Sequence, residues 1–318
     1  MAETLHFTIP QAALHRAFNG LDQELASRGE GATGKDDKGF RLNIVNAIWG
    51  QRDYRFMAAF LDTIAENYGA GIRLLDFVKE PEKSRVTIND WVSEQTEERI
   101  KDLIPQGAID TLTRMVLTNA IYFNAAWQHP FAKEATSEGA FHLLDGTEIK
   151  KQMMAQTESF GYLDGDGYQV VELPYDMDEL SMVVVFPDQG RFEEIESSLD
   201  ADFVAGVLER IRYGQVRLTM PKWEFESEFG LKDVLAAMGM PIAFSDAADF
   251  SGMTGNNDLA ISEVIHKAFV AVDEAGTEAA AATAVIMRLT AMPEIPVEVT
   301  LDRPFVFLIR DIQTGSIL

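Results

Sequence analysis

Histidine and cysteine are the residue types from which most metal sites and many nucleophilic sites are built, and this chain has five histidines and no cysteine. The histidines are His6, His15, His129, His142 and His266. Their spacing matches neither HExxH nor another compact metal-ligand pattern. No serine lies in a Gly-x-Ser-x-Gly elbow, and the lack of cysteine excludes thiol chemistry and disulfides. We therefore predict no metal site, no cofactor and no enzymatic activity, and a hydrolase has little support.

A second group of candidate ligand-binding residues lies between two strand-like segments. Gly161, Gly165 and Gly167 do not precede a helix, so their pattern indicates a hairpin turn and not a phosphate-binding loop. Asp164 and Asp166 lack the later acidic ligand of a calcium loop. We interpret all five as turn residues.

The stretch from Val272 to Thr290 carries two contradictory conformational signals. Its alanine-rich centre suits a helix on propensity alone, but Gly276 and Thr277 precede it and the β-branched Val285 and Ile286 follow it. As a strand it would place Thr277, Ala279, Ala281 and Thr283 on one face and Glu278, Ala280, Ala282 and Ala284 on the other. Because bulk strains a packed core, the face of small side chains suits a peptide that enters between two strands.

Four motifs occur in this chain in the order that they have in serpins, the loop-inserting protease inhibitors. EAGTEAAAATAV, which begins at Glu274, resembles the serpin hinge and proximal reactive loop. NAIYFNAAW from Asn119, HKAFVAVDEAG from His266 and DRPFVFLIRD from Asp302 resemble further serpin motifs. The chain therefore resembles a prokaryotic-like serpin. Against the family pattern, the N-terminal helices and the last C-terminal strand are expected to be missing.

The resemblance implies roles for particular residues. A reactive-centre loop is expected over 274–293. The hinge positions would be Glu274, Gly276, Thr277, Glu278, Ala279, Ala280, Ala281 and Ala282. Asn119 and His266 match the shutter, a hydrogen-bonded cluster under the centre of the main sheet, although each alone would be taken for a buried core residue. Trp127, Lys222 and Glu274 match the breach, where loop insertion starts.

The bond that a protease would cleave is placed by counting along the loop from Glu274. This count, taken from the family, gives Thr290 as the cleaved residue with Ala291 after it, and a shift of one residue gives Leu289. Counting back from the DRPF motif would move the bond toward Pro293, but few serine proteases accept proline there. Cleavage at Arg288 would shorten the loop and favour turnover over trapping. Thr290 suits a small specificity pocket of the elastase or subtilisin type, and Leu289 a chymotrypsin-like pocket.

Composition limits the partners of the chain. It has 318 residues, of which 47% are hydrophobic, and a formal net charge of −24. This charge disfavours nucleic acid, anionic membranes and heparin. No run of eighteen apolar residues exists that could span a membrane. We expect a monomer whose partner is a serine protease, held as a covalent acyl complex. The compartment is unknown from composition, and the resemblance slightly favours an extracellular location.

Periodicity places the elements that would position these residues. Helices are expected over 10–25, 57–67, 88–104 and 203–211, and strands over 42–49, 115–123, 168–173, 180–187, 215–220, 297–301 and 305–310. In the helix over 88–104, Glu97 would pair with Lys101 and Pro105 would end the helix. The Gly/Ser/Asp-rich loop over 27–39 is expected to be exposed.

Helices and strands do not alternate regularly, which favours an α+β fold over a doubly wound one. The resemblance specifies multiple stacked, mainly antiparallel β-sheets with surrounding helices and a mobile reactive loop, in one domain over 1–318. It implies irreversible suicide-substrate inhibition of a serine protease by loop insertion. The alternative is a non-inhibitory serpin that acts as a carrier or chaperone. Small inward hinge residues favour the inhibitor.

Overall fold

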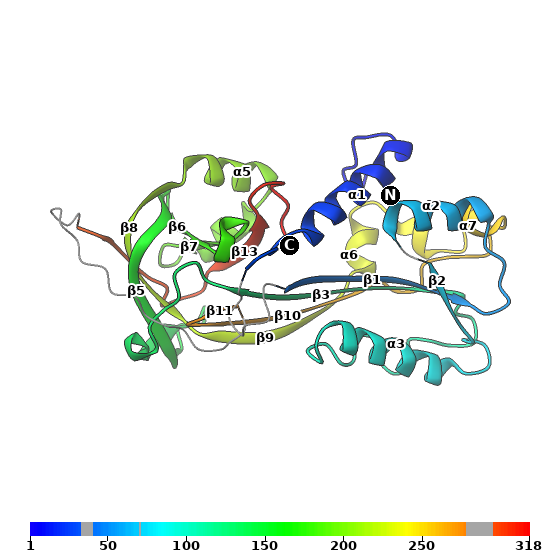
Figure 1. Cartoon of the computed structure of the whole chain (residues 1–318), viewed down its shortest axis with the longest axis horizontal. Coiled ribbons are helices and arrows are strands. Elements are labelled where there is room, and N and C mark those ends of the chain that lie inside the picture. The colour runs from blue at the N-terminus through cyan, green and yellow to red at the C-terminus, as the bar shows by residue number, and fades with distance from the viewer. Residues whose placement is uncertain (33–40, 70, 278–294) are drawn as a thin grey trace. The chain divides into compact units, whose positions relative to one another are not determined.

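The computed structural model describes residues 1–32, 41–69, 71–277 and 295–318 (Figure 1). The chain forms two compact units. Unit 1 comprises Met1–Ser27, Leu42–Phe123 and Phe225–Phe269, and unit 2 comprises Arg28–Arg41, Asn124–Glu224 and Val270–Leu318. Strands β3, β9 and β10 begin in one unit and end in the other, so one six-stranded sheet, in the order β2-β1-β3-β11-β10-β9, has residues in both.

Unit 1 consists of helices around its part of this sheet. Its helices are α1 (Gln11–Ala26), α2 (Ala58–Tyr68), α3 (Pro81–Gln95), α6 (Lys232–Ala237), η3 (Pro241–Phe244) and α7 (Ser251–Thr254), and its strands are β1 (Arg41–Gln51), β2 (Ile72–Leu75) and parts of β3 (Met115–Ala126), β9 (Trp223–Gly230) and β10 (Ile265–Asp273). Figure 1 shows α3 on one side of β1 and β3, with α1, α2 and α6 on the other side. Trp91 of α3 meets Trp49 of β1 edge to face, with ring centroids 5.3 Å apart.

Unit 2 is built on a seven-stranded sheet in the order β12-β8-β5-β6-β7-β13, with β4 paired to β5. Its elements are η1 (Lys133–Ala135), β4 (Ser137–His142), β5 (Glu148–Asp164), β6 (Tyr168–Pro174), η2 (Asp176–Asp178), β7 (Leu180–Pro187), α4 (Phe192–Ser197), α5 (Ala201–Arg210), β8 (Arg212–Pro221), β11 (Gly276–Thr277), β12 (Val297–Thr300) and β13 (Val306–Asp311). Every residue of β7 is buried, as its continuous apolar run predicts. Val183 and Val185 of β7 pack with Ile195 of α4 and Val207 of α5 in one core cluster.

The α+β class is confirmed, and most of the expected elements occur within a few residues of their predicted bounds. The pairings in the second sheet are antiparallel except that of β12 with β8, which is parallel. The single-domain interpretation stays a prediction. None of the helices in the described part of the chain is long and apolar enough to cross a membrane.

The helix expected over 88–104 is wrong in both bounds. Helix α3 begins at Pro81, a favourable first helical residue, and ends at Gln95. Thr96 then bonds back to the carbonyl of Val92, and Glu97 and Glu98 take positive φ angles. The chain folds back so that the side chain of Asn89 holds the backbone of Ile104 through bonds of 2.9 and 3.0 Å.

Two consequences follow for the predictions attached to that helix. Glu97 and Lys101 both lie after the end of α3, so they do not face each other one helical turn apart as expected, and Lys101 forms an ion pair of 4.0 Å with Glu98. Pro105 does not end the helix. Ile100 and Ile104 are buried because the irregular segment after α3 packs back on that helix. The spacing of its buried residues resembles that of a helix, although the segment is not helical.

Two smaller predictions are also corrected. Gly161 and Asp164 are not in a turn: both lie in β5, paired with Glu172 and Gln169 of β6, whereas Gly165, Asp166 and Gly167 form the turn before β6. The loop over 27–39 is not exposed at its start, because Arg28 is buried and forms an ion pair of 2.7 Å with the buried Asp311. Residues 33–39 of that loop lie outside the described residues.

Candidate insertion site

The short strand β11 lies between β3 and β10 in unit 2. Thr277 pairs with Ala125 of β3 on one side and with Val272 of β10 on the other, antiparallel to both. Further along the same two strands, in unit 1, residues 119–122 of β3 pair directly and in parallel with residues 266–269 of β10. The two strands are therefore parted at one end and joined at the other.

Gly276 makes the close approach of β11 to β3 possible. Its φ is 152°, in the region that favours glycine. A Cβ at this position would collide with the carbonyl oxygen of Ala125 and lie 2.8 Å from the Cα of Ala126. The residue before Thr277 must therefore be glycine for β11 to pair in this register.

Thr277 is fully buried, and its side chain is held by a residue that the sequence analysis missed. The hydroxyl groups of Thr277 and Tyr175 share a hydrogen bond of 2.8 Å. Tyr175 is fully buried as well, and its ring stacks on that of Trp127 with a centroid distance of 4.6 Å. Because burial raises the pKa of Tyr175, its phenol keeps its proton and can take part in this bond.

The turn that joins β10 to β11 is fixed through its backbone carbonyls. Trp127 donates from Nε1 to the carbonyl of Asp273 at 3.0 Å and from its backbone N–H to that of Ala275 at 2.9 Å. The backbone N–H of Phe131 donates to the carbonyl of Glu274 at 2.7 Å. Three consecutive carbonyls are therefore satisfied by one short segment, which holds the start of β11 in place.

The carboxylate of Glu274 is buried and bound by two donors. Lys222 Nζ lies 2.7 Å from its Oε2, and Thr136 Oγ1 donates to its Oε1 at 2.8 Å. Burial alone would raise the pKa of Glu274, but these hydrogen bonds outweigh it and lower the pKa. The structure thus brings together Trp127, Lys222 and Glu274, the predicted breach residues, and adds Thr136 and Tyr175.

We predict that Lys222→Met destabilises the protein by about 1.5 to 3 kcal/mol, the usual cost of removing a hydrogen bond to a charged group. Glu274 would then be a buried carboxylate that has lost its cationic partner and keeps the hydrogen bond from Thr136. The matched control is Lys150→Met, because Lys150 pairs with Glu138 and both are exposed, so its loss should cost about 1 kcal/mol or less. Urea denaturation measures both. Equal midpoints for the two variants would contradict the prediction.

The predicted shutter residues lie opposite each other where β3 and β10 pair directly. His266 Nδ1 and Asn119 Oδ1 are 2.8 Å apart, and Asn119 Nδ2 donates to Oδ1 of Asn46 at 2.9 Å. Asn119 and His266 are half-buried and not buried as expected, and Asn46, which the sequence did not single out, is exposed. Burial lowers the pKa of His266, which favours the neutral ring in this chain of hydrogen bonds.

The remaining predicted positions lie outside the described residues. These are the hinge residues Glu278, Ala279, Ala280, Ala281 and Ala282, the cleavage-site residues Leu289, Thr290 and Ala291, and the reactive loop from 278 to 293. The described part of the insertion site is therefore the turn at Glu274, the strand β11, and the two strands that flank it.

Comparison with known proteins finds one family and many relatives. A family model described as serpin (serine protease inhibitor) matches residues 1–318. An uncharacterized serpin-like protein of Thermococcus kodakarensis is 41% identical over 88% of this chain, which spans 65% of that protein, just under two thirds of its length. The leukocyte elastase inhibitor of Homo sapiens is 37% identical over 100% of this chain and 84% of its own length. A solved structure of thyroxine-binding globulin with thyroxine superposes with a TM-score of 0.85 at 28% identity, covering 100% of this chain and 83% of that one.

Proposed function

Because this chain belongs to the serpin family, we propose that it is an irreversible suicide-substrate inhibitor of a serine protease. Membership of the family, and relatives that are named as elastase inhibitors, support inhibition of proteases in general over an enzymatic activity. The finer proposal concerns how inhibition is achieved. The observation that carries it is the pairing of Thr277 between Ala125 of β3 and Val272 of β10, since this is the beginning of an additional strand.

The first step is an ordinary acylation. The protease takes the reactive loop as a substrate, and its serine attacks the carbonyl of Thr290, or of Leu289 in the alternative register. The new C-terminal side of the cleaved bond would begin at Ala291 or Thr290. The protease is then held on the loop as an acyl-enzyme, which water would normally hydrolyse.

The second step is the insertion of the freed loop as a strand between β3 and β10. The direct pairing of residues 119–122 with 266–269 must open for this, and the Asn119–His266 contact must be re-made. Roughly a dozen residues that gain strand hydrogen bonds at about 0.5 to 1.5 kcal/mol each contribute on the order of 10 kcal/mol. This is comparable to the stability of a typical protease, about 5 to 15 kcal/mol.

The consequence for the bound protease is a distorted active site. Loss of one oxyanion-hole donor slows acyl chemistry by roughly 10² to 10³. Hydrolysis of the acyl-enzyme then becomes so slow that the protease stays trapped on the loop. The small side chains at Ala279, Ala281 and Thr283 support this step, because they would fit between two packed strands.

The alternative function is that of a non-inhibitory carrier or chaperone. It is favoured by the structural likeness to thyroxine-binding globulin, whose solved structure is a complex with thyroxine. A carrier needs no insertable hinge, so bulky, charged or proline residues would be tolerated at its inward positions. The small residues found in this chain favour the inhibitor.

Incubation with a panel of elastase-like, subtilisin-like and chymotrypsin-like proteases tests the proposal. We expect an adduct that survives SDS electrophoresis with at least one of them. Mass spectrometry of the C-terminal peptide released from the denatured adduct identifies the bond: a peptide that starts at Ala291 or Thr290 supports the assignment, and one that starts at Leu289 shows that Arg288 is recognised. Cleavage without any adduct across the panel would support the carrier instead.

A further inference from the structure

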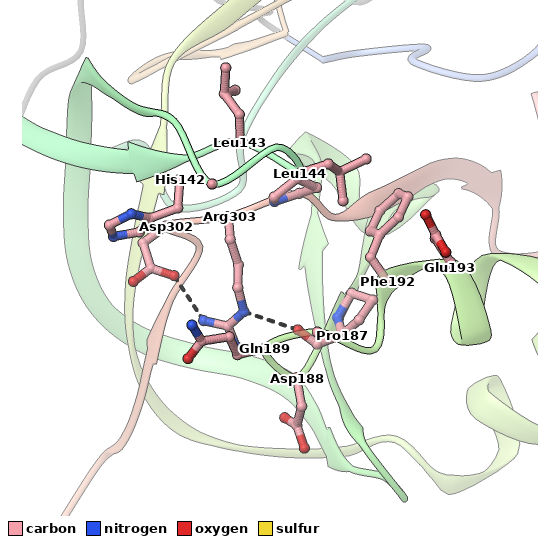
Figure 2. Close-up of a pocket in the computed structure, with 13 residues that line it drawn as sticks. His142, Leu143, Leu144, Pro187, Asp188, Gln189, Phe192, Glu193, Asp302 and Arg303 are labelled. Atoms are coloured by element: carbon pink, nitrogen blue, oxygen red, sulfur yellow. Dashed lines mark hydrogen bonds and ion pairs between the residues drawn. The ribbon is translucent and has the colours of Figure 1, made fainter.

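A cavity of about 590 Å³ opens on the surface of unit 2, where three chain segments meet. None of the residues that line it belongs to the turn at Glu274 or to β11. The segments are the turn after β4, the turn between β7 and α4, and the connection from β12 to β13. Figure 2 shows Phe192 and Pro187 on one side, His142 and Asp302 on the other, and Arg303 between them.

Backbone hydrogen bonds fix the segments that form this cavity. His142 donates to the carbonyl of Asp302 at 2.7 Å, which joins the end of β4 to the connection before β13. Leu143 donates to Thr147 at 2.8 Å and closes the turn after β4. Asp188 donates to the carbonyl of Gly167 at 2.9 Å and anchors the turn after β7. The cavity is therefore formed before any ligand arrives, as small-molecule sites usually are.

Arg303, which lines the cavity, is already bound by other groups of the protein. Its Nη1 donates to Asp302 Oδ1 at 2.9 Å and its Nε to the carbonyl of Pro187 at 3.2 Å (Figure 2). The guanidinium carbon also lies 4.0 Å from the centre of the Phe186 ring. These contacts hold the guanidinium in one place and neutralise Asp302, so Arg303 supplies a rigid wall and no free positive charge.

The remaining charges of the cavity are negative. Asp188 and Glu193 line it, and neither forms an ion pair within the described part of the chain. Leu144, Phe192 and Pro187 supply apolar surface, and Figure 2 shows Phe192 next to Glu193 and Pro187 next to Asp188. A ligand that buries an apolar body against this wall and places a positive charge near the carboxylates matches the cavity in both respects.

We propose that this cavity binds a protonated amine, amidinium or guanidinium group carried on an apolar body. Two sources have this chemistry: a small organic cation, or a basic side chain presented by a partner protein together with an apolar neighbour. This site goes beyond the proposed inhibition and does not depend on it, because none of its residues belongs to β11, its flanking strands or the reactive loop.

Titration of the ¹⁵N-labelled full chain with benzamidine tests the proposal, with benzamide as the neutral analogue and benzoate as the anionic one. We expect saturable amide shifts confined to residues 142–146, 187–193 and 302–304 with benzamidine, and none with the other two. The double variant D188N/E193Q should bind benzamidine about three- to tenfold more weakly, as expected for two exposed charges. The matched control E196Q changes an exposed glutamate of the same helix α4 outside the cavity, and should bind as the parent does.

A second ligand distinguishes a small organic cation from the basic side chain of a partner protein. A capped Arg-Phe dipeptide amide that binds more tightly than benzamidine assigns the site to a partner's side chain, and benzamidine binding without peptide binding assigns it to small organic cations. Either result supports the proposal. Absent or scattered shifts at 10 mM benzamidine, equal shifts with benzamide, or undiminished binding by D188N/E193Q would overturn it.

Discussion

Thr277→Arg is expected to turn the protein from an inhibitor into a plain substrate of its target protease. Thr277 is fully buried between β3 and β10, and its hydroxyl bonds to that of Tyr175. Arginine at this position would bury a charge with no partner and overfill the space. Insertion would then be slower than hydrolysis of the acyl-enzyme, so the loop is cut and the protease is released.

The measurement is the number of inhibitor molecules consumed per molecule of protease inactivated. We expect this number to rise at least about tenfold, which corresponds to about 1.4 kcal/mol in the competition between insertion and hydrolysis. Thr277→Ser is the matched control, because it keeps the hydroxyl that meets Tyr175 and should inhibit as the parent does. Adducts formed by Thr277→Arg at the parent stoichiometry would show that Thr277 is not the entry point of the inserted strand.

Local patterns in the sequence were sufficient to predict those elements whose burial is determined by the residue types within the element itself. The continuous apolar run of β7 predicts a strand buried on both faces, and all of its residues are buried. The small residues around Thr277 predict a segment that fits between strands, and Thr277 lies there. In both cases the constraint acts on neighbouring residues, so it can be read locally.

Other features depend on residues that are distant in the sequence and could not be predicted this way. Tyr175 and Thr277 are 102 residues apart, and nothing near Tyr175 indicates that its hydroxyl meets a threonine. The helix expected over 88–104 failed for the same reason: Ile104 is held by the side chain of Asn89 in a chain that folds back, and this produces helix-like spacing of buried residues. A resemblance to serpins supplied the long-range pairs Asn119–His266 and Lys222–Glu274, which composition and periodicity could not.

Cleavage of the reactive loop is expected to raise the melting temperature strongly. In the intact protein only Gly276 and Thr277 pair between β3 and β10 among the described residues. A cut near the far end of the loop would free the residues after Thr277 to continue this strand and replace the direct pairing of β3 with β10. With an added stability on the order of 10 kcal/mol and about 2 °C or more per kcal/mol for a chain of this size, we expect a rise of roughly 20 °C.

Thr277→Arg supplies the control for this experiment within the same chain. It can be nicked at the same bond, but its loop should not pass the buried position between β3 and β10. Its melting temperature should therefore change little on nicking. A rise as large as that of the parent would mean that the added stability comes from somewhere other than insertion at Thr277.

Scanning calorimetry of the intact and the nicked parent protein tests loop insertion between β3 and β10 most directly, because it needs no knowledge of the target protease. A single transition shifted upward by roughly 20 °C after nicking is the predicted result, on the estimate of about 2 °C per kcal/mol. A nicked protein that melts at the same temperature as the intact one, or below it, would contradict an insertable loop and leave the carrier function as the better account.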